Sequence, residues 1–250
     1  MSSQDLAFWD VYNSESTCSA SDGFTPLYDS TYLGQDDAFD GGFMLEFGGT
    51  DFKDPDDLAT REGNTINLGG AADADGLKVS AVARAIQTSP TLQYLVKLRN
   101  PSGTGITSTV RLSTDLGSDS GTTILQDSSG NSVHGDNDRW LVSTDAATAP
   151  FDDPIVTQAY RGKNAKAAST VSDPLASADE CLGVDFTVKV PAGATRYMLF
   201  FAQLHDNSGA GKNAAFKDAG AFNGQKSMAG VLKGISPKIY SKIVNWNLKK

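Results

Sequence analysis

Acidic side chains gathered in short turns are the residues of this sequence whose type could bind a metal ion. Asp36, Asp37 and Asp40 crowd one turn, and two further groups lie at residues 54–57 and 136–138. Calcium is bound by roughly six to eight oxygen atoms, which carboxylates and loop carbonyls can supply together. None of these groups has the spacing of an EF-hand, and a solvated turn in which Asp caps its own backbone is the alternative. We predict calcium as a cofactor, with Asp36, Asp37 and Asp40 as its ligands.

The two cysteines, Cys18 and Cys181, lie far apart in the sequence and could form a disulfide. Such a bridge would close a long loop and tie the N-terminal region to a late strand. Two buried thiols are the alternative. No Cys-x-x-Cys pair is present, so neither a zinc site nor a thioredoxin-type redox site is indicated. We predict the Cys18–Cys181 disulfide, because the composition is typical of secreted proteins, whose compartment is oxidising.

The spacing of the polar residues does not indicate a catalytic set. His134 and His205 lie in polar segments that we expect to form surface turns, and neither a Gly-x-Ser-x-Gly elbow nor a His-Glu-x-x-His helix is present. Glu46 and Asp185 could face each other on facing strands, as the carboxylate pair of a glycosidase does, but nothing in the sequence selects them over other acids. We therefore predict that the chain is not an enzyme.

Charge and hydropathy narrow the classes of partner. The chain has 250 residues, a formal net charge of -9 and a pI near 4.6. Neutralising phosphates takes clustered Lys and Arg, so this net charge argues against nucleic acid. No apolar run approaches the roughly 20 residues of a transmembrane helix. Residues Met1 to Asp5 lack the basic start and apolar middle of a signal peptide, which leaves the export route open.

Alternation of apolar and polar residues recurs along the chain and predicts antiparallel strands. From Leu92 to Leu98 nearly every second residue is apolar, and the pattern returns from Ile106 after a turn. Side chains of a strand point to opposite faces in turn, so one face lies on a core and the other in water. The expected strands are 38–47, 66–68, 77–86, 91–99, 106–114, 122–126, 140–143, 155–160, 185–190 and 196–204. About ten strands predict an all-β fold, an antiparallel β-sandwich or an enlarged sandwich.

The two ends of the chain differ from this pattern. After His205 the sequence predicts short C-terminal helices at 214–221 and 228–232, and Ser236-Pro237 is typical of a further helix start. Ile239, Ile243 and Trp246 would then form one apolar stripe on that last helix. We predict a single domain over residues 1–250, with residues 1–25 as an N-terminal arm.

The N-terminal arm carries large apolar side chains in a short segment. Leaving Leu6, Phe8, Trp9 and Tyr12 in water is costly, at roughly 25 cal/mol per Å² of apolar area. They could fold back onto their own domain, with Cys18 holding the return, or they could pack against a sheet edge of a like subunit. We predict these four residues as subunit contacts of a homo-oligomer or polymer.

Short turn and strand motifs along the chain resemble a β-rich module of large bacterial cell-surface and extracellular proteins. The motifs are Asp37-Ala-Phe-Asp-Gly-Gly, Asn100-Pro-Ser-Gly, Leu116-Gly-Ser-Asp119, Asp138-Arg-Trp140, Asp153-Pro154, Val190-Pro-Ala-Gly193 and Ile243-Val-Asn-Trp246. The resemblance covers most of the chain, from about Asp36 to Asn247. It implies a secreted or cell-surface location and brings no catalytic residues with it.

These observations predict an extracellular structural or adhesive protein, a self-assembling subunit of a surface or filamentous structure. Its partners would be like subunits or a cell envelope. A carbohydrate-binding module is the alternative hypothesis, and it would show an exposed aromatic platform beside a cation site. A carbohydrate-active enzyme is the third hypothesis, and it would show two acids converging in a cleft.

Overall fold

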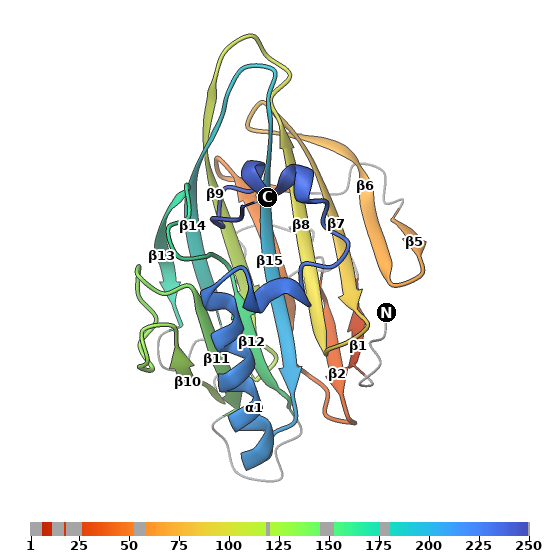
Figure 1. Ribbon diagram of the computed structural model, residues 1–250, viewed down its shortest axis with the longest axis vertical. Coiled ribbons are helices and arrows are strands. Elements are labelled where there is room, and N and C mark those ends of the chain that lie inside the picture. The colour runs from red at the N-terminus through yellow and green to blue at the C-terminus, as the bar shows by residue number, and fades with distance from the viewer. Residues whose placement is uncertain are drawn as a thin grey trace.

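The computed structural model describes residues 7–11, 18, 27–52, 59–118, 121–145, 153–175 and 181–249, and β-strands dominate them (Figure 1). The strands are β1 (Ala7–Asp10), β2 (Asp29–Tyr32), β3 (Gly41–Phe47), β4 (Thr50–Asp51), β5 (Thr60–Glu62), β6 (Thr65–Ala74), β7 (Leu77–Ile86), β8 (Thr91–Arg99), β9 (Ile106–Asp115), β10 (Thr122–Asp127), β11 (Trp140–Asp145), β12 (Ile155–Ala159), β13 (Ala168–Pro174), β14 (Cys181–Val190) and β15 (Thr195–His205). The helices are α1 (Gly209–Ala219), η2 (Gly220–Asn223), η3 (Ser227–Ala229) and η4 (Pro237–Lys242).

Two antiparallel sheets form the body of the protein. The larger sheet has eight strands in the order β10-β11-β12-β15-β8-β7-β6-β5, and the smaller has five in the order β13-β14-β9-β3-β4. β1 and β2 form a separate ribbon. The bounds expected for β7 and β8 agree with the structure, because every second side chain is buried from Leu77 to Ala85 and from Leu92 to Leu98. The predicted antiparallel β-sandwich is therefore confirmed.

Apolar residues of the alternating pattern fill the space between the sheets. Phe43 of β3, Tyr94 of β8 and Phe200 of β15 meet there, with ring centroids 5.9 Å, 6.2 Å and 6.2 Å apart. All three rings belong to one buried cluster to which both sheets and the β1–β2 ribbon contribute. The residues between them in sequence, such as Gln93 and Lys97, therefore point to the outer face of the large sheet.

Helices near the C-terminus cover part of that outer face, where α1 lies over β11 and β12 (Figure 1). Phe201 of β15, Phe222 of η2 and Trp246 pack together there, with centroids 5.2 to 6.1 Å apart. The predicted short C-terminal helices are thus confirmed. None of the helices in the described ranges is long and apolar enough to span a membrane.

The last helix is shorter than the sequence indicated. Ser236 caps it as expected, since its Oγ accepts a hydrogen bond from the Lys238 N–H at 3.3 Å. η4 nevertheless ends at Lys242, and Ile243 has extended backbone angles, with φ -72° and ψ 125°. Ile243 and Trp246 are buried, but the expectation that they share a helical stripe is wrong.

The reason for this early end lies in β15. β12 stops at Ala159, opposite Phe201, so the backbone of Leu199 has no β12 partner on that side. Asn245 takes the place of the missing strand. The Leu199 N–H donates to Asn245 Oδ1 at 3.0 Å, and Asn245 Nδ2 donates to the Leu199 carbonyl at 2.7 Å. These buried hydrogen bonds require an extended segment, because buried backbone groups are costly to leave unpaired.

Several strands carry no alternation that a sequence could show. β13 is an edge strand whose residues are all exposed or only partly buried, so no apolar face marks it. β5 is an exposed edge strand of three residues, and β2 is short and polar apart from Tyr32. Pairing with a neighbouring strand, not burial of an apolar face, creates these elements.

Candidate functional site

A shallow depression with basic walls lies on the outer face of the large sheet. Its lining is Lys78 and Ser80 of β7, Lys97 and Arg99 of β8, and Pro101, around a volume of about 380 Å³. Antiparallel pairing sets Lys78 opposite Arg99 and Ser80 opposite Lys97. Directly opposed residues have Cβ atoms about 5 Å apart, so the register of two strands gathers these three cations.

A second basic depression lies at a corner where one strand of each sheet ends before its neighbour does. β13 begins at Ala168, opposite Thr187, so Lys189 of β14 extends past its end. β12 has likewise ended before it reaches Arg196 of β15. The lining of this depression, about 340 Å³ in volume, is Lys166, Ala167, Ala168, Thr187, Lys189, Arg196 and Val244. The early ends of two strands thus create an opening with three cations around it.

Most cations of the two depressions have no acidic partner. Lys78 forms an ion pair with Asp73 at 2.8 Å. Among the described residues, no carboxylate lies within 4.0 Å of the remaining cations, which are Lys97, Arg99, Lys166, Lys189 and Arg196. The net charge of the chain is -9, yet each of the two depressions is lined by three positively charged side chains. A local positive potential of this kind favours an anionic ligand.

The two depressions flank the start of β15. Thr195, its first residue, pairs with Arg99 of the first depression, and Arg196 of the second depression follows it in sequence. Consecutive side chains of a strand point to opposite faces, so the side chains of Thr195 and Arg196 lie on opposite sides of β15, with one depression on each side. Both therefore lie at the same end of the sandwich, beside the β8–β9 and β14–β15 connections.

Sequence reasoning missed this basic end. Lys97 and Arg99 flank Leu98, and this alternation marks them as outward-facing. The signal for exposure was therefore present. The sequence did not show which residues lie next to these cations, because Lys78 lies opposite Arg99 only through the register of β7 on β8.

A row of ionic residues crosses the outer face of the small sheet. Glu46 of β3, Arg111 of β9 and Asp185 of β14 are cross-strand neighbours. Arg111 Nε donates to Asp185 Oδ1 at 2.8 Å, and Arg111 Nη1 lies 3.6 Å from Glu46 Oε2. Burial raises the pKa of Glu46 above its ordinary value, which Arg111 opposes and Asp51 reinforces. The guanidinium lies between the two acids, so they are bridged by a cation and do not face a cleft as a glycosidase pair does.

Both histidines are buried, so the expectation of surface turns is wrong for them. His134 lies in the β10–β11 connection, where its Nε2 is 2.6 Å from Tyr160 Oη. Burial lowers the pKa of His134 to about 4, against the raising effect of Asp138. His205 ends β15, and its Nε2 lies 3.3 Å from Oδ2 of Asp218 in α1. Tyr160 contacts the ring of His134 and Asp218 of α1 contacts that of His205, and turn composition does not reveal such tertiary contacts.

The three aspartates predicted to bind calcium are exposed in the segment between β2 and β3. They are Asp36, Asp37 and Asp40, and they do not appear as a cluster with converging ligand atoms. Within the described ranges, one set of three acidic, thiol or imidazole groups has its ligand atoms within 4.8 Å of one another, and it consists of Cys18, Asp115 and Cys181. Both sulfurs of that group are consumed in a disulfide, so it offers no thiolate to a metal. Calcium binding at the three aspartates stays a prediction.

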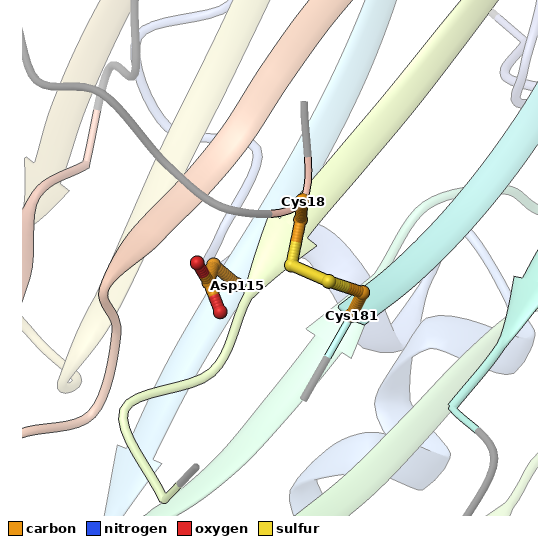
Figure 2. A group of neighbouring side chains, drawn as sticks. All are labelled: Cys18, Asp115 and Cys181. Carbon is orange, nitrogen blue, oxygen red and sulfur yellow. A yellow bond between two sulfur atoms is a disulfide. The ribbon is translucent and has the colours of Figure 1, made fainter. Parts of the chain in front are cut away.

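The structure contains the predicted disulfide between Cys18 and Cys181 (Figure 2). The two Cα atoms are 5.3 Å apart, and 163 positions separate the cysteines in sequence. Figure 2 shows the bridge joining Cys18 to the start of β14, with the Asp115 side chain close by. In the chain-entropy model a loop of this length stabilises the folded state by about 5 kcal/mol. Bridges of this kind persist in oxidising compartments.

The described part of the N-terminal arm packs on its own domain. β1 pairs with β2, and Trp9 is 1% exposed within the main core. Phe8 points the other way and is 52% exposed. Leu6 and Tyr12 lie outside the described residues. Of the predicted subunit contacts that can be placed, Phe8 is therefore the one whose side chain is available to another molecule.

Comparison with known proteins finds structural neighbours of low similarity. No protein-family model matches the chain, and no curated protein matches it in sequence. A structure described as an aldose 1-epimerase from Klebsiella pneumoniae has a TM-score of 0.36 and 10% identity, covering 67% of this chain and 58% of that one. A polysaccharide lyase has a TM-score of 0.38 and 10% identity, covering 84% of this chain and 34% of that one. A protein described as a kojibiose phosphorylase from the human microbiome has a TM-score of 0.39 and 7% identity, covering 91% of this chain and 30% of that one.

These neighbours contradict the prediction that the chain is not an enzyme, because all three are described as enzymes that act on carbohydrates. We correct that prediction and do not retain it. The chain spans less than two thirds of the length of each neighbour. Likenesses with TM-scores below 0.5 assign no activity, substrate or residue role to this chain. Its function has to be argued from its own side chains.

Proposed function

We propose that this protein is an extracellular adhesive β-sandwich that binds acidic polysaccharide at its two basic depressions. The observation that carries the proposal is that Lys97, Arg99, Lys166, Lys189 and Arg196 gather at one end of an acidic chain and have no acidic partner among the described residues. Acidic side chains elsewhere repel a polyanion. The ligand would therefore meet the protein at this end alone, in one orientation.

Polysaccharide is the polyanion that fits the setting of the depressions. The disulfide supports an oxidising compartment outside the cytosol. Proteins that bind single-stranded nucleic acid stack its bases on aromatic side chains, and the residues lining the two depressions include no aromatic side chain. Pro101 in the first depression, and Ala167, Ala168 and Val244 in the second, instead give apolar surface on which a sugar ring can pack.

The energetics favour a polymer over a single sugar. An exposed ion pair contributes only about 0.2 to 1 kcal/mol. One charged sugar could meet two or three cations and would bind weakly. A polysaccharide that carries one charge per residue or per pair of residues would reach both depressions at once, and its second contact would be intramolecular. Binding should therefore rise with chain length and fall with salt.

Binding to matched polymers tests the proposal. Dextran sulfate and polygalacturonate would be compared with uncharged dextran by calorimetry or by migration in affinity gels at low salt. We expect binding to the two charged polymers and none to dextran. The double variant Lys97→Glu/Arg99→Glu should weaken that binding by about tenfold or more, since it removes two contacts and adds two repulsions.

Lys238→Glu provides the matched control, because Lys238 is exposed on η4 and lines neither depression. It changes the net charge in the same sense and should leave binding nearly unchanged. Equal losses in the control and in the double variant would mean that only net charge matters, and the proposal would fail. Tighter binding to a single-stranded oligonucleotide than to either charged polymer would replace polysaccharide by nucleic acid.

A second candidate function, association of like subunits, is favoured by one observation. Three of the four most exposed large hydrophobic side chains among the described residues, Phe8, Tyr28 and Leu33, lie in or beside the β1–β2 ribbon. Such a group could pack against another copy of the chain. Sedimentation velocity of the protein and of Phe8→Ser tests it, because a single-sized monomer in both cases would exclude this association.

A further inference from the structure

Two buried carboxylates lie close together at the base of the β10–β11 connection, residues 128–139. Asp127 is 0% exposed and Asp138 is 3% exposed. Ser129 joins them, because its N–H donates to Asp127 Oδ1 at 2.7 Å and its hydroxyl donates to Asp138 Oδ1 at 2.6 Å. One residue thus holds both carboxylates, and their negative charges are brought together inside the protein.

Neither carboxylate is paired with a cation. In the described ranges no Lys or Arg nitrogen lies within 4.0 Å of an oxygen of Asp127 or Asp138. The neighbouring guanidinium of Arg161 donates instead to the backbone carbonyls of Asp136 and Asp138, at 2.5 Å and 2.7 Å. Buried charges in proteins are paired with an opposite charge or coordinate a metal ion, because desolvation is otherwise too costly.

A further observation is that, among the described residues, buried polar atoms without a hydrogen-bond partner occur on Asp127 itself and on Gln158, two strands away in the large sheet. Asp127 Oδ2 accepts no hydrogen bond, although Oδ1 of the same group accepts two. Gln158 is 1% exposed, and neither its Oε1 nor its Nε2 has a partner. Leu141 pairs with Asp127 on one side and with Gln158 on the other, so the two polar side chains share one face of the sheet. An unsatisfied buried atom costs about 1 to 3 kcal/mol, and on Asp127 it belongs to a buried carboxylate without a cationic partner, so a bound cation would be stabilising at this oxygen.

We propose that the β10–β11 connection binds a calcium ion, with Asp127 Oδ2 and the carboxylate of Asp138 as its anionic ligands. The donor atoms here are oxygens, which suit calcium better than zinc or copper. Loop hydroxyls and carbonyls complete the coordination, as they do in other calcium loops. The ion neutralises the two buried charges and fixes the connection on the sheet. This inference is independent of polysaccharide binding.

The spacing of the oxygen-bearing residues agrees with this assignment. Counted from Asp127 as position 1, Ser129, Asn131 and Asp138 stand at positions 3, 5 and 12. These positions supply side-chain ligands in an EF-hand loop. The segment departs from that loop in having Ser132 instead of Gly at position 6 and Asp instead of Glu at position 12. The acidic group at residues 136–138 already contains Asp138, but its spacing does not connect it with Asp127 at the other end of the connection.

Terbium luminescence tests the site directly. Tb³⁺ replaces calcium at oxygen sites, and its emission is sensitised by a nearby aromatic ring, here Tyr160 or Trp140. We expect the full-length protein, freed of metal by a chelator, to give a saturable Tb³⁺ signal that calcium displaces. Asp127→Asn should weaken calcium binding by about a hundredfold or more, since even residues outside the ligand set contribute about 10- to 100-fold in metal sites. Calcium should also raise the melting temperature of the unsubstituted protein and not that of the variant.

Glu62→Gln is the matched control, because it removes one exposed acid on β5, far from any proposed ligand in the chain, and should leave the Tb³⁺ signal and the calcium shift unchanged. If Asp127→Asn does not fold, Asp138→Asn replaces it. Slower hydrogen exchange of the Ser129 and Gly135 amides in calcium then tests the same site in the unsubstituted protein. The proposal is overturned if calcium changes neither luminescence nor melting of the unsubstituted protein. It is overturned equally if binding survives in Asp127→Asn and is lost in the control.

Discussion

Replacing Tyr94 by Phe should stabilise the protein, although Tyr94 lies at the centre of its main core. The ring stacks on Phe43 at 5.9 Å with parallel planes and packs beside Phe200 at 6.2 Å. Its hydroxyl is fully buried and has no hydrogen-bond partner in the described structure. Burial also raises the pKa of Tyr94, so the hydroxyl stays neutral. The substitution keeps both ring contacts and removes one unsatisfied polar atom.

The expected gain follows from the cost of that atom. An unsatisfied buried hydroxyl costs about 1 to 3 kcal/mol, and the small void left by its removal offsets part of the stability gained. We therefore expect the free energy of unfolding to rise by about 1 kcal/mol, which corresponds to about 2 to 4 °C in the melting temperature of a chain of this size. Urea denaturation monitored by tryptophan fluorescence, with the slope of the transition held constant, would measure it.

Tyr160→Phe is the matched control, because it makes the same chemical change at a hydroxyl that is hydrogen-bonded. Tyr160 Oη lies 2.6 Å from His134 Nε2, and both groups are buried. Its loss should cost about 1 to 2 kcal/mol, since the histidine nitrogen is left unpaired. Opposite signs for the two variants are the expected result. A destabilised Tyr94→Phe would refute the reasoning and indicate that an internal water satisfies the Tyr94 hydroxyl.

Three further perturbations have expected outcomes. Burial lowers the pKa of His134 to about 4, so as pH falls below about 6.5 the unfolded chain takes up a proton that the folded protein does not. Between about pH 7.5 and pH 5, in chelator, the free energy of unfolding should therefore fall by about 2 kcal/mol more in the unsubstituted protein than in His134→Gln. Equal losses for the two proteins in urea titrations would contradict this. Mass spectrometry without reduction should find one internal bridge, and reducing Cys18–Cys181 should lower stability by up to about 5 kcal/mol, whereas two titratable thiols in the native protein would reject the bridge. Trp9→Ala should cost about 3 to 5 kcal/mol and Phe8→Ala very little, because only the first side chain is buried; equal costs in thermal unfolding would place both residues in the same environment.

The fold class could be predicted from the sequence because burial of one strand face leaves a mark on every second residue. β7 and β8 show this mark along their whole lengths, and the bounds expected for them hold. The disulfide could also be predicted, since two cysteines allow a single pairing. A single domain over the whole chain stays a prediction that one cooperative unfolding transition would support.

The candidate sites could not be found in the same way. Lys78 and Arg99 are distant in sequence, and each resembles any other exposed cation of a strand. The meeting of Lys78 with Arg99 depends on strand order and register, and local sequence patterns constrain neither strongly. Asp127 and Asp138 lie within twelve consecutive residues, so their spacing could be read from the sequence, whereas their burial could not.

The sequence by itself thus determined which residues form the main strands, which of their faces is apolar, and which two cysteines can pair. Tertiary structure alone decided that β12 and β13 stop early and open the second depression. It also decided that His134 is buried against Tyr160 and that the C-terminal segment is extended beside β15. The physical reason is that alternation records contact with a core, which is a local property of each strand. Cross-strand neighbours and the ends of strands are set by pairing between distant segments, and the free energy of that pairing is shared among residues that no short stretch of sequence contains.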